Sequence, residues 1–149
     1  SKTPCLKQMI DSYKGNGGLV AVEEIKGEEI ANYGVLEIDS IDNDLLKIKS
    51  LVEKPLFQKA PSKYAVVGRY ILTSSVFEYL DQQNKDAGGE IQLTDAISWA
   101  ANKEPYFGKK IEGDRFDCGS KIGYQRANIA FSLDREELAA DLYEYIKSL

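Results

Sequence analysis

The sequence predicts an α/β fold, because segments typical of strands alternate along the chain with segments typical of helices. Short apolar runs indicate the strands, and apolar side chains three or four residues apart indicate the helices. The length of 149 residues fits one ordinary domain, and 43% hydrophobic with 29% charged residues is a globular composition. We therefore expect residues 1–149 to form a single domain with its own core.

The first two expected elements are a helix and a buried strand. Thr3 is placed to cap a helix with Pro4 in its first turn, and apolar residues then recur at helical spacing as far as Tyr13. Residues 19–22 form a short, nearly continuous apolar run after a glycine pair. Such a run favours a buried central strand over a helix of that length.

A hairpin is expected next. Residues 34–39 and 45–53 are strand-like, and the polar residues 40–44 between them predict the turn. Pro55 cannot donate to a sheet ladder and biases the residue before it toward an extended backbone. The second strand should therefore end at Lys54, with that residue extended.

The rest of the chain continues the alternation and ends in helices. The expected elements are a strand at 65–72 interrupted by Gly68, a helix capped by Ser74, a loop at 84–89, a helix to about Asn102, strands at 106–111 and 114–118, a helix from Ser120 to about Phe131, and a last helix with Asp134 and Glu137 as its capping box. The last helix carries an apolar stripe, which we expect to pack in its own domain, with subunit contacts as the alternative.

The composition excludes several classes of function. A formal net charge of −5 and a sequence pI near 4.9 disfavour a nucleic-acid partner, because phosphate-backbone binding requires clustered Lys and Arg. No apolar run approaches the roughly 20 residues that cross a bilayer, so no membrane partner is expected. The chain lacks histidine and has two distant cysteines, Cys5 and Cys118, which gives little support to zinc or Cys-His chemistry and fits the cytoplasm.

Four sequence blocks carry the functional signal. They are LVEKP (51–55), VVGRY (66–70), GEIQLTD (89–95) and RFDCG (115–119). The first block sets the carboxylate of Glu53 beside the ammonium of Lys54 at the end of a predicted strand. A carboxylate can accept hydrogen bonds from sugar hydroxyls, and an ammonium can bind a phosphate as a point charge.

Together with CLKQMID (5–11) and YGV (33–35), the blocks resemble the bacterial UTP:glucose-1-phosphate uridylyltransferases, or UDP-glucose pyrophosphorylases. The resemblance implies a mixed-sheet, C-terminal portion of a Rossmann-like nucleotide-diphospho-sugar transferase fold with flanking helices. Such enzymes begin with a Gly-rich nucleotide-binding loop that has no counterpart here. We therefore expect the chain to be the sugar-phosphate-binding half of such an enzyme and to be inactive alone.

The resemblance also assigns roles to individual residues. Lys54 and Asp117 are implied in catalysis, Asp117 as a ligand of Mg²⁺, and the residues implied in substrate binding are Gly34, Glu53, Lys54, Gly68 and Tyr70. The groups at 53, 54 and 117 should converge on one cleft for a phosphorylated hexose. The substrates implied are glucose 1-phosphate and UTP, and the C-terminal helices imply a homo-oligomer.

Each role has a structural alternative. Glu53 and Lys54 can form an exposed pair at a strand end, and Asp117 can cap the helix that follows it. The two glycines can serve turn or bulge geometry, and Tyr70 can pack in the core. Cys118 is expected to be a buried small side chain. Glu90 and Asp95 fit a helix N-terminus, and the roles of Arg69 and Arg115 stay open.

Two other functions remain in view. A related sugar nucleotidyltransferase, such as a glucose-1-phosphate thymidylyltransferase, shares the Glu-Lys-Pro signature, while CLKQMI, GEIQLTDAI and RFDCGSKIGY favour the uridylyl branch. A noncatalytic sugar-phosphate binding or assembly module is consistent with the missing nucleotide loop.

Overall fold

The computed structural model describes residues 3–82 and 90–149. The chain forms two compact units, residues 1–112 and 113–149, and each is described by itself. The expected loop at 84–89 lies outside the described residues. Whether the two units act as one domain, as the length suggests, stays a prediction.

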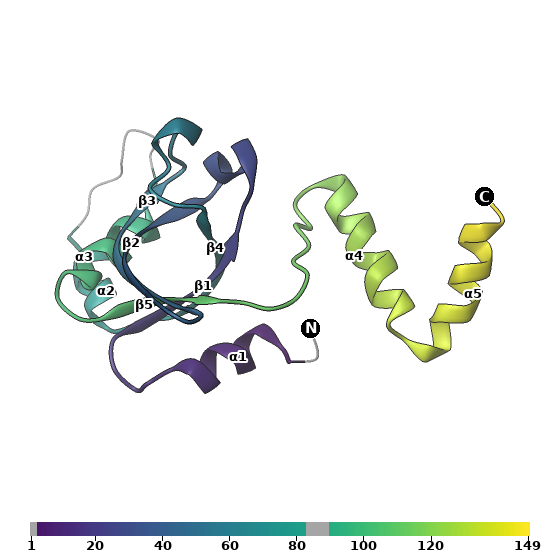
Figure 1. Cartoon of the computed structure of the whole chain (residues 1–149), viewed down its shortest axis with the longest axis horizontal. Coiled ribbons are helices and arrows are strands. Elements are labelled where there is room, and N and C mark those ends of the chain that lie inside the picture. Colours follow the sequence, from purple (N-terminus) through teal and green to yellow (C-terminus); the bar gives the residue numbers. More distant parts are fainter. Residues whose placement is uncertain (1–2, 83–89) are drawn as a thin grey trace. The chain divides into compact units, whose positions relative to one another are not determined.

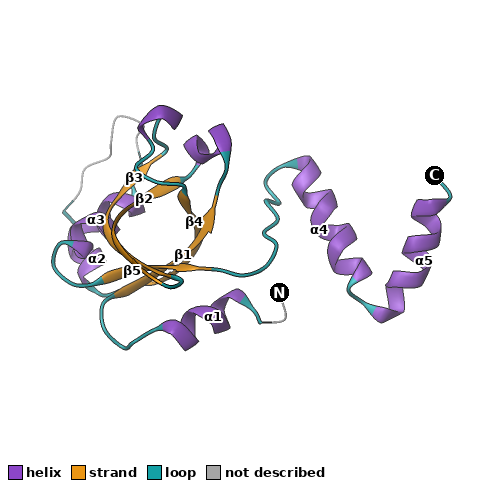
Figure 2. Cartoon of the chain, viewed as in Figure 1, coloured by secondary structure: helices purple, strands orange, loops and turns teal. Residues whose placement is uncertain are grey.

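The larger unit is built around a closed sheet. Its strands are β1 (Gly18–Glu24), β2 (Gly34–Asp42), β3 (Leu45–Glu53), β4 (Tyr64–Ile71) and β5 (Tyr106–Lys110). Their order around the barrel is β1-β4-β2-β3-β5, and β5 returns to β1 (Figure 2). The β1–β5 pair is parallel and the other pairs are antiparallel. The predicted α/β fold with a mixed sheet is therefore confirmed, whereas closure into a barrel was not predicted.

Strand β1 is buried on both faces. Val20 and Val22 belong to the main core cluster, and Leu19 and Ala21 pack in a second cluster with Met9 of helix α1 (Cys5–Ser12). Burial on both faces explains why this strand is continuously apolar. The central strand and the opening helix are confirmed, although Pro4 rather than Thr3 occupies the N-cap position.

Two further helices cover the sheet near β3. They are α2 (Ser75–Leu80) and α3 (Leu93–Ala101), whose buried side chains join the main cluster (Figure 1). The Ser98 hydroxyl fixes α3 to β3, since it accepts the Leu51 N–H at 2.7 Å and donates to the Leu51 carbonyl at 3.1 Å. Ser74 stands at the N-cap of α2 without a side-chain cap bond, contrary to the predicted cap. Short 3₁₀ turns, η1 (Gly27–Asn32) and η2 (Phe57–Lys59), complete this unit.

The hairpin is tighter than predicted. β2 continues to Asp42, and the connection is reduced to Asn43 and Asp44, with Asn43 at φ 54°. The polar residues 40–42 were interpreted as a turn, but they pair with residues 45–47 of β3. Residues 40–42 are exposed, so their polar side chains stay in water while their backbone pairs with β3. Cross-strand pairing thus outweighs low strand propensity here.

Lys54 departs from the predicted backbone conformation. β3 ends at Glu53, one residue before the predicted end, and Lys54 has φ 42° instead of an extended backbone. Its N–H donates to the carbonyl of Tyr33 at 3.1 Å, a bond that fixes the turn out of the strand. A tertiary hydrogen bond has overridden the local preference of a residue before proline.

Gly68 interrupts β4 as predicted. Val20 pairs with Tyr70 and Val22 pairs with Val66, so three residues of β4 face one residue of β1. Gly68 lies in this bulge with φ 77°, a conformation that favours glycine.

The smaller unit consists of two helices, α4 (Lys121–Leu133) and α5 (Glu136–Lys147). The Ser120 hydroxyl accepts the Gly123 N–H at 3.1 Å, which confirms the predicted cap. Residues 114–118 form no strand, and the N-cap of α5 is Arg135 rather than Asp134, so both of these predictions were wrong. Arg135 carries no acceptor side chain, and α5 begins without a side-chain cap bond.

The apolar stripe of α5 is not buried as expected. No residue of this helix is buried, and Tyr145 is 62% exposed. None of the helices in the described part of the chain combines the length and apolar character needed to span a bilayer.

Candidate functional site

Gly34 and Glu53 lie directly opposite each other where β2 begins and β3 ends. A Cβ atom added to Gly34 would lie 3.2 Å from Oε2 of Glu53 and 2.7 Å from Cγ2 of Thr94. Glycine is therefore required here by close packing, because any side chain would displace the carboxylate or the threonine. Gly34 is buried, and its backbone lies directly against the Glu53 carboxylate.

Lys54 places its ammonium beside this carboxylate. Successive side chains of a regular strand point to opposite faces, but the left-handed backbone at Lys54 leaves the strand pattern. Its Nζ atom lies 4.0 Å from Oε1 of Glu53. The Lys54 side chain is 65% exposed and that of Glu53 is 28% exposed, so the pair is loose and adds little to stability. Both charges remain accessible to a ligand.

Tyr70 is the third predicted residue in this region. Burial raises the pKa of its phenol, and the negative charge of Glu53 raises that pKa further. The phenol therefore lies within electrostatic reach of the carboxylate. Tyr70 also packs against the main core cluster, as its structural alternative predicted.

Gly68, another predicted substrate-binding residue, is not closely packed against other residues. A Cβ atom at Gly68 would meet nothing within 4 Å, so its φ of 77° is what requires glycine. Its predicted contact with substrate stays a prediction.

Thr94 was missed by the sequence analysis. It is the second residue of α3, is 7% exposed, and its methyl group packs beside Gly34. The GEIQLTD block contributed to the family resemblance, but its residues were given only the role of a helix start, with Glu90 and Asp95 at the positive end of the helix dipole. A polar residue between the inward positions Leu93 and Ile97 was the available signal.

Asp117 lies in the smaller unit. Its Oδ1 accepts the Gly119 N–H at 3.0 Å, and its carbonyl accepts the Ser120 hydroxyl at 3.0 Å. These bonds are those of the turn alternative, in which Asp117 prepares the start of α4. Its expected convergence with Glu53 and Lys54 stays a prediction.

The fit to a metal ion is incomplete. Among residues 3–82 and 90–149, no three or more His, Cys, Asp or Glu side chains lie close enough together to hold one. Asp117 is exposed and offers a single carboxylate, one oxygen of which serves the turn. Magnesium is often held by one or two carboxylates with waters and substrate phosphates, so Asp117 can supply only part of such a site.

The cysteine next to it differs from expectation. Cys118 is exposed, and the prediction of a buried side chain was wrong. It stands in the exposed turn at 118–120, which offers no core to pack against.

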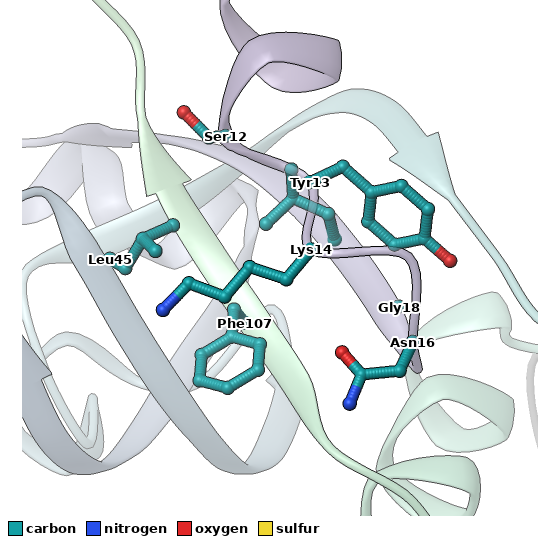
Figure 3. A pocket seen from close by; sticks show the side chains of 8 residues that line it. Ser12, Tyr13, Lys14, Asn16, Gly18, Leu45 and Phe107 are labelled. Carbon is teal, nitrogen blue, oxygen red and sulfur yellow. The ribbon is translucent and has the colours of Figure 1, made fainter.

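Two hollows lie away from these residues. The one in Figure 3 is lined by residues including Tyr13, Lys14, Asn16 and Phe107 and measures about 10 Å³, room for about one water molecule. A wider one of about 330 Å³ is lined mainly by residues of η1, η2 and their flanks. Neither includes a predicted site residue.

Comparison with known proteins identifies the class. The model of the nucleotidyl transferase family matches residues 3–130. The chain therefore belongs to the nucleotidyl transferase family.

Particular relatives narrow the comparison. A UTP–glucose-1-phosphate uridylyltransferase of Staphylococcus epidermidis is 37% identical over 150 aligned residues, which cover 100% of this chain and 52% of the relative. A UDP-glucose pyrophosphorylase solved with UDP-glucose is 39% identical with a TM-score of 0.79, covering 88% of this chain and 50% of that one. UTP-bound UGPase from Acinetobacter baumannii is 30% identical with a TM-score of 0.86, covering 100% of this chain and 52% of that one. The chain thus spans about half the length of these proteins.

The placement of Glu53 beside Tyr70 can be tested by titration. In the variant Glu53→Gln, the pKa of Tyr70 should fall, because a nearby negative charge disfavours the phenolate. It should still exceed the ordinary value of 10.0, since burial remains. A ¹³C NMR titration with tyrosine labelled at Cζ measures this shift.

The matched control is Glu37→Gln. Glu37 lies on β2 and is paired with Lys49 at 2.6 Å, so its replacement should leave the pKa of Tyr70 unchanged. An identical Tyr70 pKa in wild type and Glu53→Gln would show that the carboxylate does not face the phenol.

Proposed function

We propose that this chain provides the glucose 1-phosphate site of a uridylyltransferase, which converts UTP and glucose 1-phosphate to UDP-glucose and pyrophosphate. The observation that carries the proposal is the grouping of Gly34, Glu53 and Lys54 at the shared end of β2 and β3. The names of the relatives support the choice of substrates.

The chemistry of the grouping suits a phosphorylated hexose. Glu53 can accept hydrogen bonds from ring hydroxyls with charge-assisted strength, and the absence of a side chain at Gly34 leaves room for that carboxylate. Lys54 neutralises part of the charge on the sugar phosphate. The Lys54 ammonium and the Glu53 carboxylate are 4.0 Å apart. One small molecule can therefore bind the ammonium through its phosphate and the carboxylate through its hydroxyls.

The reaction needs positioning more than a reactive side chain. A phosphate oxygen of glucose 1-phosphate attacks the α-phosphorus of UTP, a new P–O bond forms, and pyrophosphate leaves. No covalent enzyme intermediate is required, which agrees with a chain that lacks histidine. Glu53 and Lys54 contribute by holding the attacking phosphate in one orientation. With no Gly-rich nucleotide loop in its sequence, the 149-residue chain alone should form negligible UDP-glucose.

Calorimetric titration of the chain with glucose 1-phosphate tests the proposal. Glu53→Gln and Lys54→Met should each weaken binding by roughly tenfold or more, because each removes a charged hydrogen-bonding partner worth about 1.5–3 kcal/mol. Lys49→Met is the matched control, since Lys49 is an exposed lysine on the same strand that pairs with Glu37. It should bind as wild type does.

The comparison of substrates separates this function from its rivals. If the chain binds glucose 1-phosphate no better than glucose, or if the Glu53 and Lys54 variants bind it like wild type, the proposal fails. Assays of UTP against dTTP with a longer protein that contains this chain distinguish a uridylyltransferase from a thymidylyltransferase.

Asp117 is assigned as one ligand of Mg²⁺ within the same proposal, the metal supplying charge stabilisation of the phosphates when bound. The variant Asp117→Asn keeps the oxygen that accepts the Gly119 N–H but removes the charge that a hard cation prefers. Its melting temperature should match that of wild type. Mn²⁺ added with UDP-glucose should broaden the NMR signals of residues 116–119 in wild type and much less in Asp117→Asn. Equal broadening in the two proteins would remove Asp117 from the metal site.

Self-association is the last part of the proposal. The smaller unit exposes several large apolar side chains, and patches of this kind often mark a contact with another protein chain. They include Ile122, Tyr124, Phe131, Leu138, Tyr145 and Ile146. The chain should sediment as a dimer or larger species at micromolar concentration, and Tyr145→Glu should shift it toward monomer. Asp141→Asn, on the same helix, is the control and should leave the mass unchanged. A monomeric wild type would rule this out.

A further inference from the structure

Thr94 carries a buried hydroxyl that the fold does not satisfy. The residue is 7% exposed, and its Oγ1 atom has no hydrogen-bond partner in the described chain. A buried hydroxyl without a partner lowers stability, and protein interiors rarely tolerate one without a reason.

A second hydroxyl on the same helix provides the contrast. Ser98 lies one turn further along α3, and its hydroxyl both accepts from and donates to the backbone of Leu51. The packing of α3 on β3 therefore explains Ser98 completely. It does not explain why Thr94 is a threonine rather than a valine of the same shape.

The position of Thr94 gives the explanation. A Cβ atom built on Gly34 would lie 2.7 Å from Cγ2 of Thr94 and 3.2 Å from Oε2 of Glu53. Thr94 and the proposed sugar-binding carboxylate thus both lie against Gly34. A sugar that binds the Glu53 carboxylate would therefore lie near Thr94.

The two groups are chemically complementary. An ionised carboxylate only accepts hydrogen bonds, whereas a threonine hydroxyl can also donate. A sugar hydroxyl needs one acceptor for its proton and one donor for its lone pair. Glu53 and Thr94 can together supply both.

We infer that Thr94 is a specificity-determining residue that donates a hydrogen bond to a hydroxyl of the bound hexose. The same sugar hydroxyl donates a hydrogen bond to Glu53. The inference rests on the proposed function, because it requires a sugar phosphate at Glu53. A hexose that lacks this hydroxyl leaves the buried Thr94 hydroxyl unpaired and removes one hydrogen bond to Glu53, so it should bind more weakly.

The test compares Thr94→Val with Thr94→Ser by calorimetry with glucose 1-phosphate and by thermal unfolding without it. Valine keeps the shape and removes the hydroxyl, so binding should weaken by roughly five- to tenfold while the melting temperature stays equal or rises. Serine keeps the hydroxyl and should bind within about twofold of wild type. A merely structural hydroxyl would instead lower the melting temperature of Thr94→Val.

Thr73→Val is the control for loss of a threonine hydroxyl. Thr73 bonds to Glu104 and, at 2.8 Å, to the hydroxyl of Tyr106, so its removal should lower the melting temperature and leave the affinity unchanged. Monodeoxy analogues of glucose 1-phosphate complete the test. One of them should bind wild type more weakly than glucose 1-phosphate does, and Thr94→Val should not distinguish the two.

The outcomes separate the inference from the proposed function. If Glu53→Gln weakens binding and Thr94→Val does not, the sugar site stands and the role of Thr94 is overturned. A fall in the melting temperature of Thr94→Val in the absence of sugar overturns it as well. If neither wild type nor any variant binds glucose 1-phosphate, the proposed function and the inference that depends on it are both overturned.

Discussion

The register between β2 and β3 is the constraint on which the proposed sugar site depends. Gly34 faces Glu53 at the end of this ladder, and a slip by one residue would move the carboxylate to the opposite face of the sheet. The irregular pairings of β2 lie after Glu37, so the stretch next to the site is regular. Helix α3 is tied to the same strand through Ser98 and Leu51, and this tie also sets the position of Thr94. The β2–β3 ladder and the hydrogen bonds of Ser98 thus fix β2, β3 and α3 around Gly34.

Three carboxylates of the larger unit differ in how closely a lysine approaches them. Glu24 and Glu37 pair closely with lysines, at 2.8 Å and 2.6 Å, and the hydrogen bonds from those lysines are the main reason that their pKa values are lowered. Glu53 has no partner as close as these among the described residues, since Lys54 approaches it only to 4.0 Å. Its negative charge instead acts on the phenol of Tyr70. Of these three carboxylates, the one with the most distant lysine is therefore the one beside Gly34.

Local signals in the sequence predicted most of the elements and part of the site. The apolar run at 19–22, the end of β3 before Pro55 and the interruption at Gly68 each depend on burial or backbone chemistry that a few residues reveal. The barrel closure was not predictable, since it depends on pairs between distant strands such as Val35 with Ala65. The conformation of Lys54 depends on a bond to Tyr33, twenty-one positions earlier, and Thr94 stands out only once its surroundings are known. The Glu-Lys motif predicted the adjacent charges at the end of β3, because both residues are neighbours in the chain, and their role in binding stays a prediction.

Closure of the barrel has a consequence for solubility and folding. An open sheet ends in strands whose outer amide and carbonyl groups can template cross-β growth with other molecules. In the described part of the larger unit each strand pairs with two others, so no outermost strand is left to recruit foreign backbone. The parallel β1–β5 pair that completes the ring joins residues 18–22 to 106–110, and contacts this distant in sequence carry a large loop-closure cost that slows their formation. Before β1 and β5 pair, the partly folded sheet would still have a free edge strand. The longer this edge stays free, the more time the chain would have to pair with other molecules.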